Sequence, residues 1–199
     1  PTTGLYKLEG NTTNVVGNRE PKFTGGLTNT FRWKDLTLSF LLDFRIGGDI
    51  YNGTQYYLTT YGQSERTLDR SSITVSGVNS ETGEPYSQTY NVGDSYVING
   101  NTYSGEYMIR QYWSSNYASN AYNFIQNVNW LKLRSLSLSY DFSNLIKGQN
   151  ILKNLTATFA ANNLFTITNY KGGMDPEVAA VGSTGGSGSI GIEYCGVPT

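Results

Sequence analysis

The stretch "FRWKDLTLSFLLDFRIGG", residues 31–48, alternates in a way that decides the fold. From residue 36 onward every second side chain is large and apolar: Leu36, Leu38, Phe40, Leu42, Phe44 and Ile46. Successive side chains of a β-strand point to opposite faces of the sheet. The stretch therefore predicts a strand with one apolar face and one mostly polar face. Such an apolar face must be covered, either by a packed protein core or by lipid.

The composition argues against several classes of function. The net charge of −1 gives no reason to expect nucleic acid as a partner, because nucleic-acid binding depends on clusters of Lys and Arg. The chain has no His, which removes the usual proton shuttle and the Ser-His and Cys-His nucleophile pairs. Its single cysteine, Cys195, permits neither an intrachain disulfide nor a thiolate cluster. We therefore expect a protein that is not an enzyme and that holds no metal and no cofactor.

Four segments alternate regularly enough to predict strands, so the expected fold class is all-β. A two-residue turn at Lys34-Asp35 would join the first two strands and would leave no charged residue on their shared apolar face. Lys-Asp is not the Asn-Gly pair that tight turns prefer, so a slightly longer loop of the same parity stays open. The predicted strands lie near residues 23–33, 36–47, 129–142 and 154–168.

The third predicted strand changes its phase. Leu131 and Leu133 occupy odd positions, whereas the apolar residues from Leu136 onward occupy even positions. A β-bulge adds one residue to a strand and so shifts the alternation by one. We therefore expect a bulge or twist near Arg134-Ser135, which would turn the basic residues away from the apolar face.

Short and long connections alternate along the chain. The first two strands are joined by about two residues, whereas a long polar loop, residues 48–128, separates the second strand from the third. Antiparallel up-and-down strands of about ten residues with this pattern of connections are typical of outer-membrane barrels. The sequence thus predicts part of a large transmembrane β-barrel with long extracellular loops. The alternative is a soluble or surface-attached β-sandwich that binds glycans or mediates adhesion, because sandwich strands also have one apolar face.

Three stretches carry a resemblance to a known family. Their motifs are Glu20-Pro21-Lys22-Phe23, a Lys-Leu-Arg strand, an Asn-Asn-Leu-Phe strand and a Gly-x-Asp-Pro-Glu loop at residues 173–177. In order and spacing they resemble the last part of TonB-dependent outer-membrane transporters of the SusC/RagA branch. The stretches are "GNREPKFTGGLTNTFRWKDLTLSFLLDFRIGGDIYN", "NWLKLRSLSLSYDF" and "LTATFAANNLFTITNYKGGMDPEV".

The resemblance implies a location and a set of partners. Such transporters are 22-stranded barrels in the outer membrane, each closed by an N-terminal plug, and they import oligosaccharides or peptides with energy delivered through TonB. A SusD-like lipoprotein covers the barrel from outside. Residues 1–199 would then be a C-terminal fragment of the barrel domain, with outer-membrane lipid around it, without the plug, the TonB-contact segment or the closing strand. Such a fragment is expected to transport nothing by itself.

Aromatic side chains of the long loop are candidates for substrate binding. Flat aromatic faces beside amides suit the capture of a sugar or peptide, and we expect Tyr107, Tyr112, Trp113 and Tyr117 to bind cargo. Two other interpretations stay open for these residues. In one they pack against one another within the loop, and in the other they contact the lipoprotein.

Charged residues are candidates for the polar side of the sheet. Arg32, Asp43 and Arg45 are expected to face the barrel lumen, where they would touch cargo or plug or pair with each other. Asp175 and Glu177 would bind a cation or, by default, form a turn, because two carboxylates are too few for a Ca²⁺ site by themselves.

Overall fold

The computed structural model describes residues 4–8, 14–148, 151–172, 175–177 and 192–193. The described residues form two compact units. We call residues 19–50, 126–148, 151–172 and 175–177 the sheet unit, and residues 4–8, 14–18, 51–125 and 192–193 the loop unit. Among the described residues no helix has the length and apolar character needed to cross a membrane.

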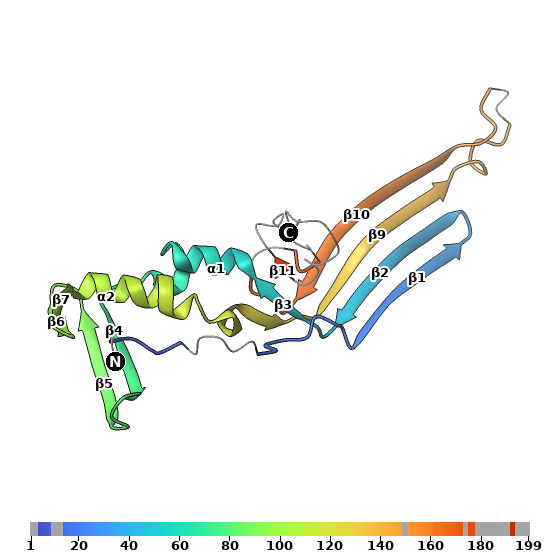
Figure 1. Cartoon of the computed structure of the whole chain (residues 1–199). Helices are drawn as coiled ribbons and strands as arrows, with labels where there is room; N and C mark the ends of the chain where they lie inside the picture. The colour runs from blue at the N-terminus through green and yellow to red at the C-terminus, as the bar shows by residue number, and fades with distance from the viewer. Residues whose placement is uncertain (1–3, 9–13, 149–150, 173–174, 178–191, 194–199) are drawn as a thin grey trace, which may run out of the picture. The chain divides into compact units, whose positions relative to one another are not determined.

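The sheet unit is built on four long antiparallel strands, which run side by side in Figure 1. Their order in the sheet is β1-β2-β9-β10, so each strand neighbours the next one of the four along the chain. All four coincide with the predicted segments to within two residues at each end. The strands are β1 (Phe23–Trp33), β2 (Leu36–Ile46), β9 (Trp130–Asp141) and β10 (Thr156–Thr168).

The predicted register of the first hairpin is confirmed. Trp33 pairs with Leu36 and Phe23 pairs with Ile46, with every residue between them in step. The turn consists of the two residues Lys34 and Asp35, so the longer loop that the sequence left open is not formed. Lys34 adopts a left-handed backbone conformation with φ of 53°. That conformation explains how a turn without glycine can still match the twist of the strands.

The predicted bulge in the third strand is confirmed as well. On β9, Ser135 pairs with Leu41 of β2 and Leu133 pairs with Leu42, so Arg134 is the extra residue. The neighbouring strand β10 also shifts its register between residues 162 and 165, and Asn163 there has φ of 52°. The bulge keeps the apolar residues on both sides of it on one face of the sheet.

The apolar face of the sheet is exposed. Its side chains include Phe31 at 56% exposure, Trp33 at 69%, Phe159 at 65% and Ile167 at 62%. Within the described part of the sheet unit, no second sheet packs against these four strands. Buried apolar residues of this unit gather instead at the end of the strands where the long connection begins, and they are Ile50, Val128, Trp130 and Tyr170.

The predicted long loop folds into structure of its own, which the sequence reading did not anticipate. Its core consists of Ile73, Val75, Tyr90, Met108 and Ile109. Strands β4 and β5 and helix α2 supply these side chains. The described elements between β2 and β9, together with β11, are β3 (Asp49–Asn52), α1 (Gly53–Thr60), η1 (Glu65–Thr67), β4 (Ser72–Val78), β5 (Pro85–Asn91), β6 (Ser95–Ile98), β7 (Asn101–Ser104), α2 (Gly105–Gln111), the π-helix η2 (Tyr112–Tyr117), η3 (Ala121–Phe124), β8 (Ile125–Asn127) and β11 (Ile192–Glu193).

Two hairpins and a cap define the loop unit locally. Strands β4 and β5 pair in antiparallel fashion, as do β6 and β7, while β11 runs parallel to β3. Helix α1 begins where the Asn52 side chain accepts a hydrogen bond from the backbone N–H of Gln55 at 2.8 Å. Asparagine is a favoured residue at this position because its oxygen satisfies an N–H that has no partner within the helix.

Candidate functional site

Small hydroxyl side chains line the polar face of the sheet. Thr30 and Ser39 share a hydrogen bond of 3.0 Å across β1 and β2, and Ser139 and Thr158 share one of 2.9 Å across β9 and β10. Cross-strand pairs of this kind add to the stability of a sheet. The face opposite the apolar one is therefore suited to contact with water.

Five charged side chains form a cluster on this polar face. The Lys132 ammonium nitrogen lies 2.5 and 2.7 Å from the two carboxylate oxygens of Asp175, and 2.6 Å from Glu177 Oε2. The Arg134 guanidinium donates two hydrogen bonds to Asp43 Oδ2, one from Nε at 3.1 Å and one from Nη2 at 2.9 Å. It also donates a hydrogen bond to Glu177. The cluster fastens residues 175–177 to strands β2 and β9.

Burial gives the cluster its strength. Lys132 is 4% exposed, which is tolerable for an ammonium group only when it is paired and hydrogen-bonded. The Trp130 ring adds a second attraction, since Nζ of Lys132 lies 5.4 Å and Cζ of Arg134 lies 5.6 Å from ring centroids of that side chain. Charge-assisted bonds and the aromatic ring together make this the most restrained part of the polar face.

The three predicted lumen-facing residues share the polar face, but they do not pair with one another. Asp43 pairs with Arg134 rather than with either predicted arginine. Arg45 donates to the backbone carbonyls of Gly47 at 3.0 Å and Arg19 at 2.8 Å. Arg32 lies opposite Thr37 in the register. The expectation of mutual pairing is therefore wrong, because the bulge in β9 brings a closer cation to Asp43.

The possible cation site in the Asp-Pro loop is occupied by protein cations. Both carboxylates of that loop, Asp175 and Glu177, accept hydrogen bonds from Lys132, and the backbone N–H of Glu177 closes a turn onto Asp175 Oδ1 at 2.9 Å. Over the described residues no group of three or more metal-ligating side chains is found. The interpretation of Asp175 and Glu177 as part of a turn fits this loop better than their interpretation as ligands of a cation.

Three of the four predicted aromatic residues lie on the π-helix η2 and pack together. The ring of Trp113 lies 5.0 Å from the ring of Tyr112 and 5.1 Å from that of Tyr117, measured between centroids. The Tyr117 hydroxyl also accepts a hydrogen bond of 3.0 Å from Arg66. A π-helical segment is rare and is often found at functional sites. Here it holds an aromatic cluster together, in line with the self-packing alternative.

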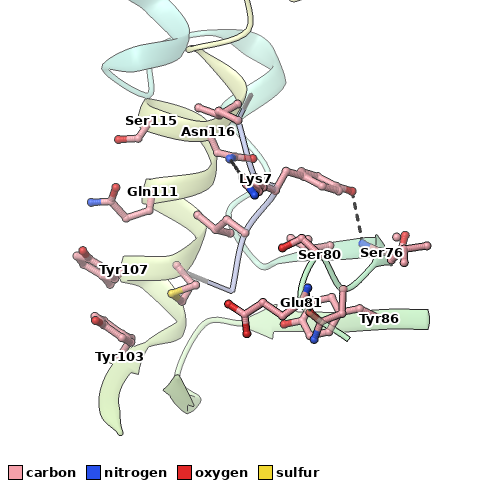
Figure 2. Close-up of a pocket in the computed structure, with 18 residues that line it drawn as sticks. Lys7, Ser76, Ser80, Glu81, Tyr86, Tyr103, Tyr107, Gln111, Ser115 and Asn116 are labelled. Carbon is pink, nitrogen blue, oxygen red and sulfur yellow. Dashed lines mark hydrogen bonds between the residues drawn. The ribbon is translucent and has the colours of Figure 1, made fainter. Parts of the chain in front are cut away.

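Tyr107 lies apart from that cluster. Its ring stacks on the ring of Tyr103 at a centroid distance of 5.2 Å and an interplanar angle of 17°. Both rings line a groove of about 570 Å³ in the loop unit, drawn in Figure 2. That volume is in the range of ligand sites, roughly 300–1,000 Å³. Tyr107 thus lines an open groove, and another predicted binding residue, Trp113, lines a second pocket of about 750 Å³.

The groove runs between a helix and a hairpin. One wall comes from α2 and η2, with Gln111, Ser115 and Asn116, and the other comes from β4 and the turn after it, residues 75–81. The segment formed by residues 5–8 lies along it. Among the residues that line it only Lys7 and Glu81 carry charge, so the groove as a whole is neutral, and its lining mixes polar and apolar side chains.

Sequence reasoning missed several of these residues. Lys132 and Arg134 were noticed only as breaks in the alternation, because no register was predicted between β2 and β9; there Lys132 lies opposite Asp43 and Arg134 is the bulge residue. Asn116 and Tyr90 carried no signal, because their contacts reach residues at the other end of the loop unit. Asn116 donates to the carbonyl of Tyr6, and Tyr90 donates to that of Gly4.

Comparison with known proteins points to one family. No family model matches the chain. The chain is similar to TonB-dependent receptor P39 of Formosa agariphila, at 23% identity over 170 residues that make up 85% of this chain and 14% of the relative. It is also similar to TonB-dependent receptor P3 of the same organism, at 23% identity over 164 residues, 82% of this chain and 13% of the relative. The chain thus spans about a seventh of the length of these curated relatives, and the similarity supports the TonB-dependent receptor family.

Proposed function

We propose that this chain forms part of the barrel wall of a TonB-dependent importer in the outer membrane, in the C-terminal part of a SusC/RagA-type transporter. The observation that carries the proposal is the sheet of β1, β2, β9 and β10, whose apolar face is exposed while its opposite face is polar. Soluble monomers rarely expose a continuous apolar patch larger than a few hundred Å². Lipid is a cover that suits such a face.

The placement of charge supports a lipid environment. Asp43, Arg45, Lys132 and Arg134 all lie on the polar side, and the apolar side carries no charged residue along the paired lengths of β1 and β2. A Lys or Arg on the lipid face at the middle of the bilayer costs about 2–4 kcal/mol. An aqueous lumen on the opposite side would solvate the charges that the sheet does carry.

The length of the strands agrees with the thickness of the membrane. Strands β1 and β2 have 11 residues and β10 has 13. At about 3.3 Å per residue and a tilt near 40°, such strands span roughly 27–33 Å, enough to cross an apolar band of about 25 Å. Aromatic residues near the strand ends, such as Trp33 and Tyr140, would lie at the interfaces.

The rest of the assignment follows from this placement. The loop unit would form part of the extracellular surface, where a SusD-like lipoprotein would cover the barrel and where oligosaccharides or peptides would enter. Arg32, Asp43 and Arg45 would face the lumen, and Tyr107 would contact cargo. TonB would act through parts of the complete transporter that lie outside residues 1–199.

A matched pair of substitutions tests the proposal. Leu42 lies on the apolar face opposite Leu27, and Leu41 lies on the polar face opposite Thr28. Leu42→Arg is expected to abolish assembly in the outer membrane, whereas Leu41→Arg should leave it largely intact. Assembly is measured as heat-resistant, protease-protected protein in the outer-membrane fraction of cells that make the complete transporter.

The two variants change the same residue type at adjacent positions, so general intolerance of arginine would affect both. Equal amounts of both variants in the membrane would contradict a lipid-facing sheet, and so would loss of the Leu41→Arg protein alone. A β-sandwich module would instead yield a 199-residue chain that is soluble without detergent and unfolds cooperatively. No feature of the described residues favours that alternative.

A further inference from the structure

We propose that the groove of the loop unit binds an extended peptide, which adds as a third strand to the free edge of β4. The inference rests on the proposed function in one respect: the peptide is taken to be cargo of the importer. It concerns the groove between β4 and the α2–η2 helix, and it selects a peptide over a sugar as the ligand.

The outer edge of β4 pairs with no strand in the described part of the chain. Two hydrogen bonds fix which residues face β5: Val92 N–H donates to the Ser71 carbonyl at 3.0 Å, and Asn79 N–H donates to the Glu84 carbonyl at 2.9 Å. In an antiparallel pair the residues that face the partner alternate with residues that face outward. Odd-numbered residues of β4 therefore face β5, and even-numbered residues face away from it.

The outward-facing residues of β4 are Ser72, Thr74, Ser76 and Val78. In the described part of the chain β4 and β5 form a sheet of two strands, so no third strand occupies this edge. Ser76 and Val78 are among the residues that line the groove, and the Ser76 N–H points to the Tyr6 hydroxyl, which belongs to another lining residue. An extended peptide lying there would receive main-chain hydrogen bonds from alternate residues.

This edge also lacks the features that normally prevent pairing. Natural edge strands are blunted by charged side chains, by proline or by bulges. The sequence of β4, "SITVSGV", contains no charge and no proline, and its pairing with β5 is regular from Ser72 to Val78. An unprotected edge of seven residues is a liability unless a partner uses it.

The chain's own residues 5–8 line the groove, and the segment of residues 4–8 is held by its main chain. The Tyr90 hydroxyl donates to the carbonyl of Gly4 at 2.7 Å, and the Asn116 amide donates to the carbonyl of Tyr6 at 2.7 Å. These bonds recognise backbone carbonyls two residues apart. One residue that lines the groove, Asn116, therefore already holds a segment of this chain by its main chain.

A single contact marks where the ligand would compete. The Ser76 N–H donates to the Tyr6 hydroxyl at 3.4 Å, shown as a dashed line in Figure 2. That distance is at the long end for a hydrogen bond, whose N···O separation is usually 2.7–3.2 Å. A peptide carbonyl at normal distance would replace it, and Tyr6 would move aside with its main chain still held by Asn116.

The chemistry of the groove favours a peptide over an oligosaccharide. Strand addition needs donors and acceptors that alternate along a line, and the edge of β4 supplies them; a sugar has no matching repeat. The lining also includes Gln111 and the stacked rings of Tyr103 and Tyr107, which Figure 2 draws on the side of the helix away from the β4–β5 hairpin. With one cation and one anion at its lining, the groove suits an uncharged peptide.

The first test uses the complete wild-type transporter, purified in detergent micelles. A pool of capped, uncharged, fluorophore-labelled hexapeptides is screened by anisotropy, and the best binder is resynthesised with N-methyl groups on either its odd or its even backbone nitrogens. Strand addition predicts that one methylated set loses affinity at least about tenfold while the other stays within about threefold of the parent. Equal effects of the two sets would overturn the proposal.

The second test removes a donor from the protein. Ser76→Pro deletes the outward N–H, and a proline is tolerated on an edge strand when its N–H position faces away from the ladder. Its control is Ser87→Pro, because Ser87 pairs with Ser76 and its N–H faces outward on the other edge of the same hairpin. We expect Ser76→Pro to weaken binding at least about fivefold and Ser87→Pro to leave it within about twofold.

Three results would refute the inference. The first is the absence of peptide binding up to about 1 mM. The second is an equal loss of peptide affinity in the two proline variants, and the third is displacement of the peptide by a glucose hexasaccharide. If Ser76→Pro fails to fold, the methylated peptides still decide the matter with unaltered protein. The readout is binding in detergent, so it is separate from membrane assembly of the Leu42 and Leu41 variants and can fail independently of it.

Discussion

The charged cluster on the sheet makes a quantitative prediction about Lys132. Lys132→Met keeps the length and the aliphatic part of the side chain but removes the ammonium group from between Asp175 and Glu177. The two carboxylates then lose their closest cation, while Arg134 still donates to Glu177. We expect residues 175–177 to detach from the strands and the sheet unit to lose stability.

The size of the effect follows from the burial of each partner. Breaking a fully buried ion pair by removing one member costs about 3–5 kcal/mol. Lys132 meets that condition with a side chain that is 5% exposed, but Asp175 and Glu177 are 29% and 30% exposed, so water can partly solvate them once the lysine is gone. The discounted expectation is a loss of about 1–3 kcal/mol in the free energy of unfolding.

Urea unfolding of the lipid-reconstituted protein, followed by tryptophan fluorescence, measures this loss. Trp130 is a direct reporter because its ring lies 5.4 Å from the Lys132 nitrogen. A second variant, Lys132→Met combined with Asp175→Asn and Glu177→Gln, removes the unpaired charges and should recover at least about half of the loss. The reasoning fails if the single variant is within about 0.5 kcal/mol of wild type, or if the combined variant is no more stable than the single one.

Three further predictions concern single backbone or side-chain positions. Gly4 has φ of +68°, and an added Cβ would lie 2.4 Å from the Tyr90 hydroxyl oxygen, so Gly4→Ala should destabilise the loop unit by about 1–3 kcal/mol and speed amide exchange in β4 and β5. Burial raises the pKa of Tyr90 above the ordinary tyrosine value of 10.0. The buried neutral hydroxyl therefore contributes fully to the free energy of unfolding below pH 10, and this contribution is lost as the pH rises further, because the unfolded chain releases the proton more readily than the folded one. Near-UV circular dichroism between about pH 8 and 11 should show a steeper alkaline loss of structure for wild type than for Tyr90→Phe. At the bulge of β10, Asn163 has φ of 52°, so Asn163→Val should lower the urea midpoint while Asn163→Gly leaves it nearly unchanged.

The sheet unit could be predicted because its information is local and periodic. The register of β1 and β2 follows from alternation and from a turn that joins adjacent segments, and a slip of one residue would put Asp43 and Arg45 on the apolar face. The bulge follows from a phase change between Leu133 and Leu136. In both cases a single rule about side-chain direction is sufficient.

The loop unit could not be predicted in this way because its core is assembled from distant residues. Gly4 meets Tyr90 and Tyr6 meets Asn116, contacts that span most of the first half of the chain. The polar composition of residues 48–128 suggested an irregular loop, yet a few apolar residues such as Ile73 and Met108 suffice to form a compact core. The charged cluster was missed for the same reason, since Lys132 and Asp175 are 43 residues apart.

The bulge at Arg134 bears on what covers the apolar face. A regular strand would place either Leu131 and Leu133 or Leu136 and Leu138 on the polar face, and in the latter case hydroxyl side chains would interrupt the apolar face along half of β9. A bulge gives up regular ladder hydrogen bonds, so a strand keeps one only where a continuous face matters more than the ladder. A protein core can accommodate a misplaced serine by pairing it with a neighbour, but hydrocarbon offers no partner to an exposed polar group. With the bulge, Leu131, Leu133, Leu136 and Leu138 of β9 share one face, and Asn29 is the polar residue on the paired length of β1 and β2; this agrees with the lipid-facing sheet that we propose.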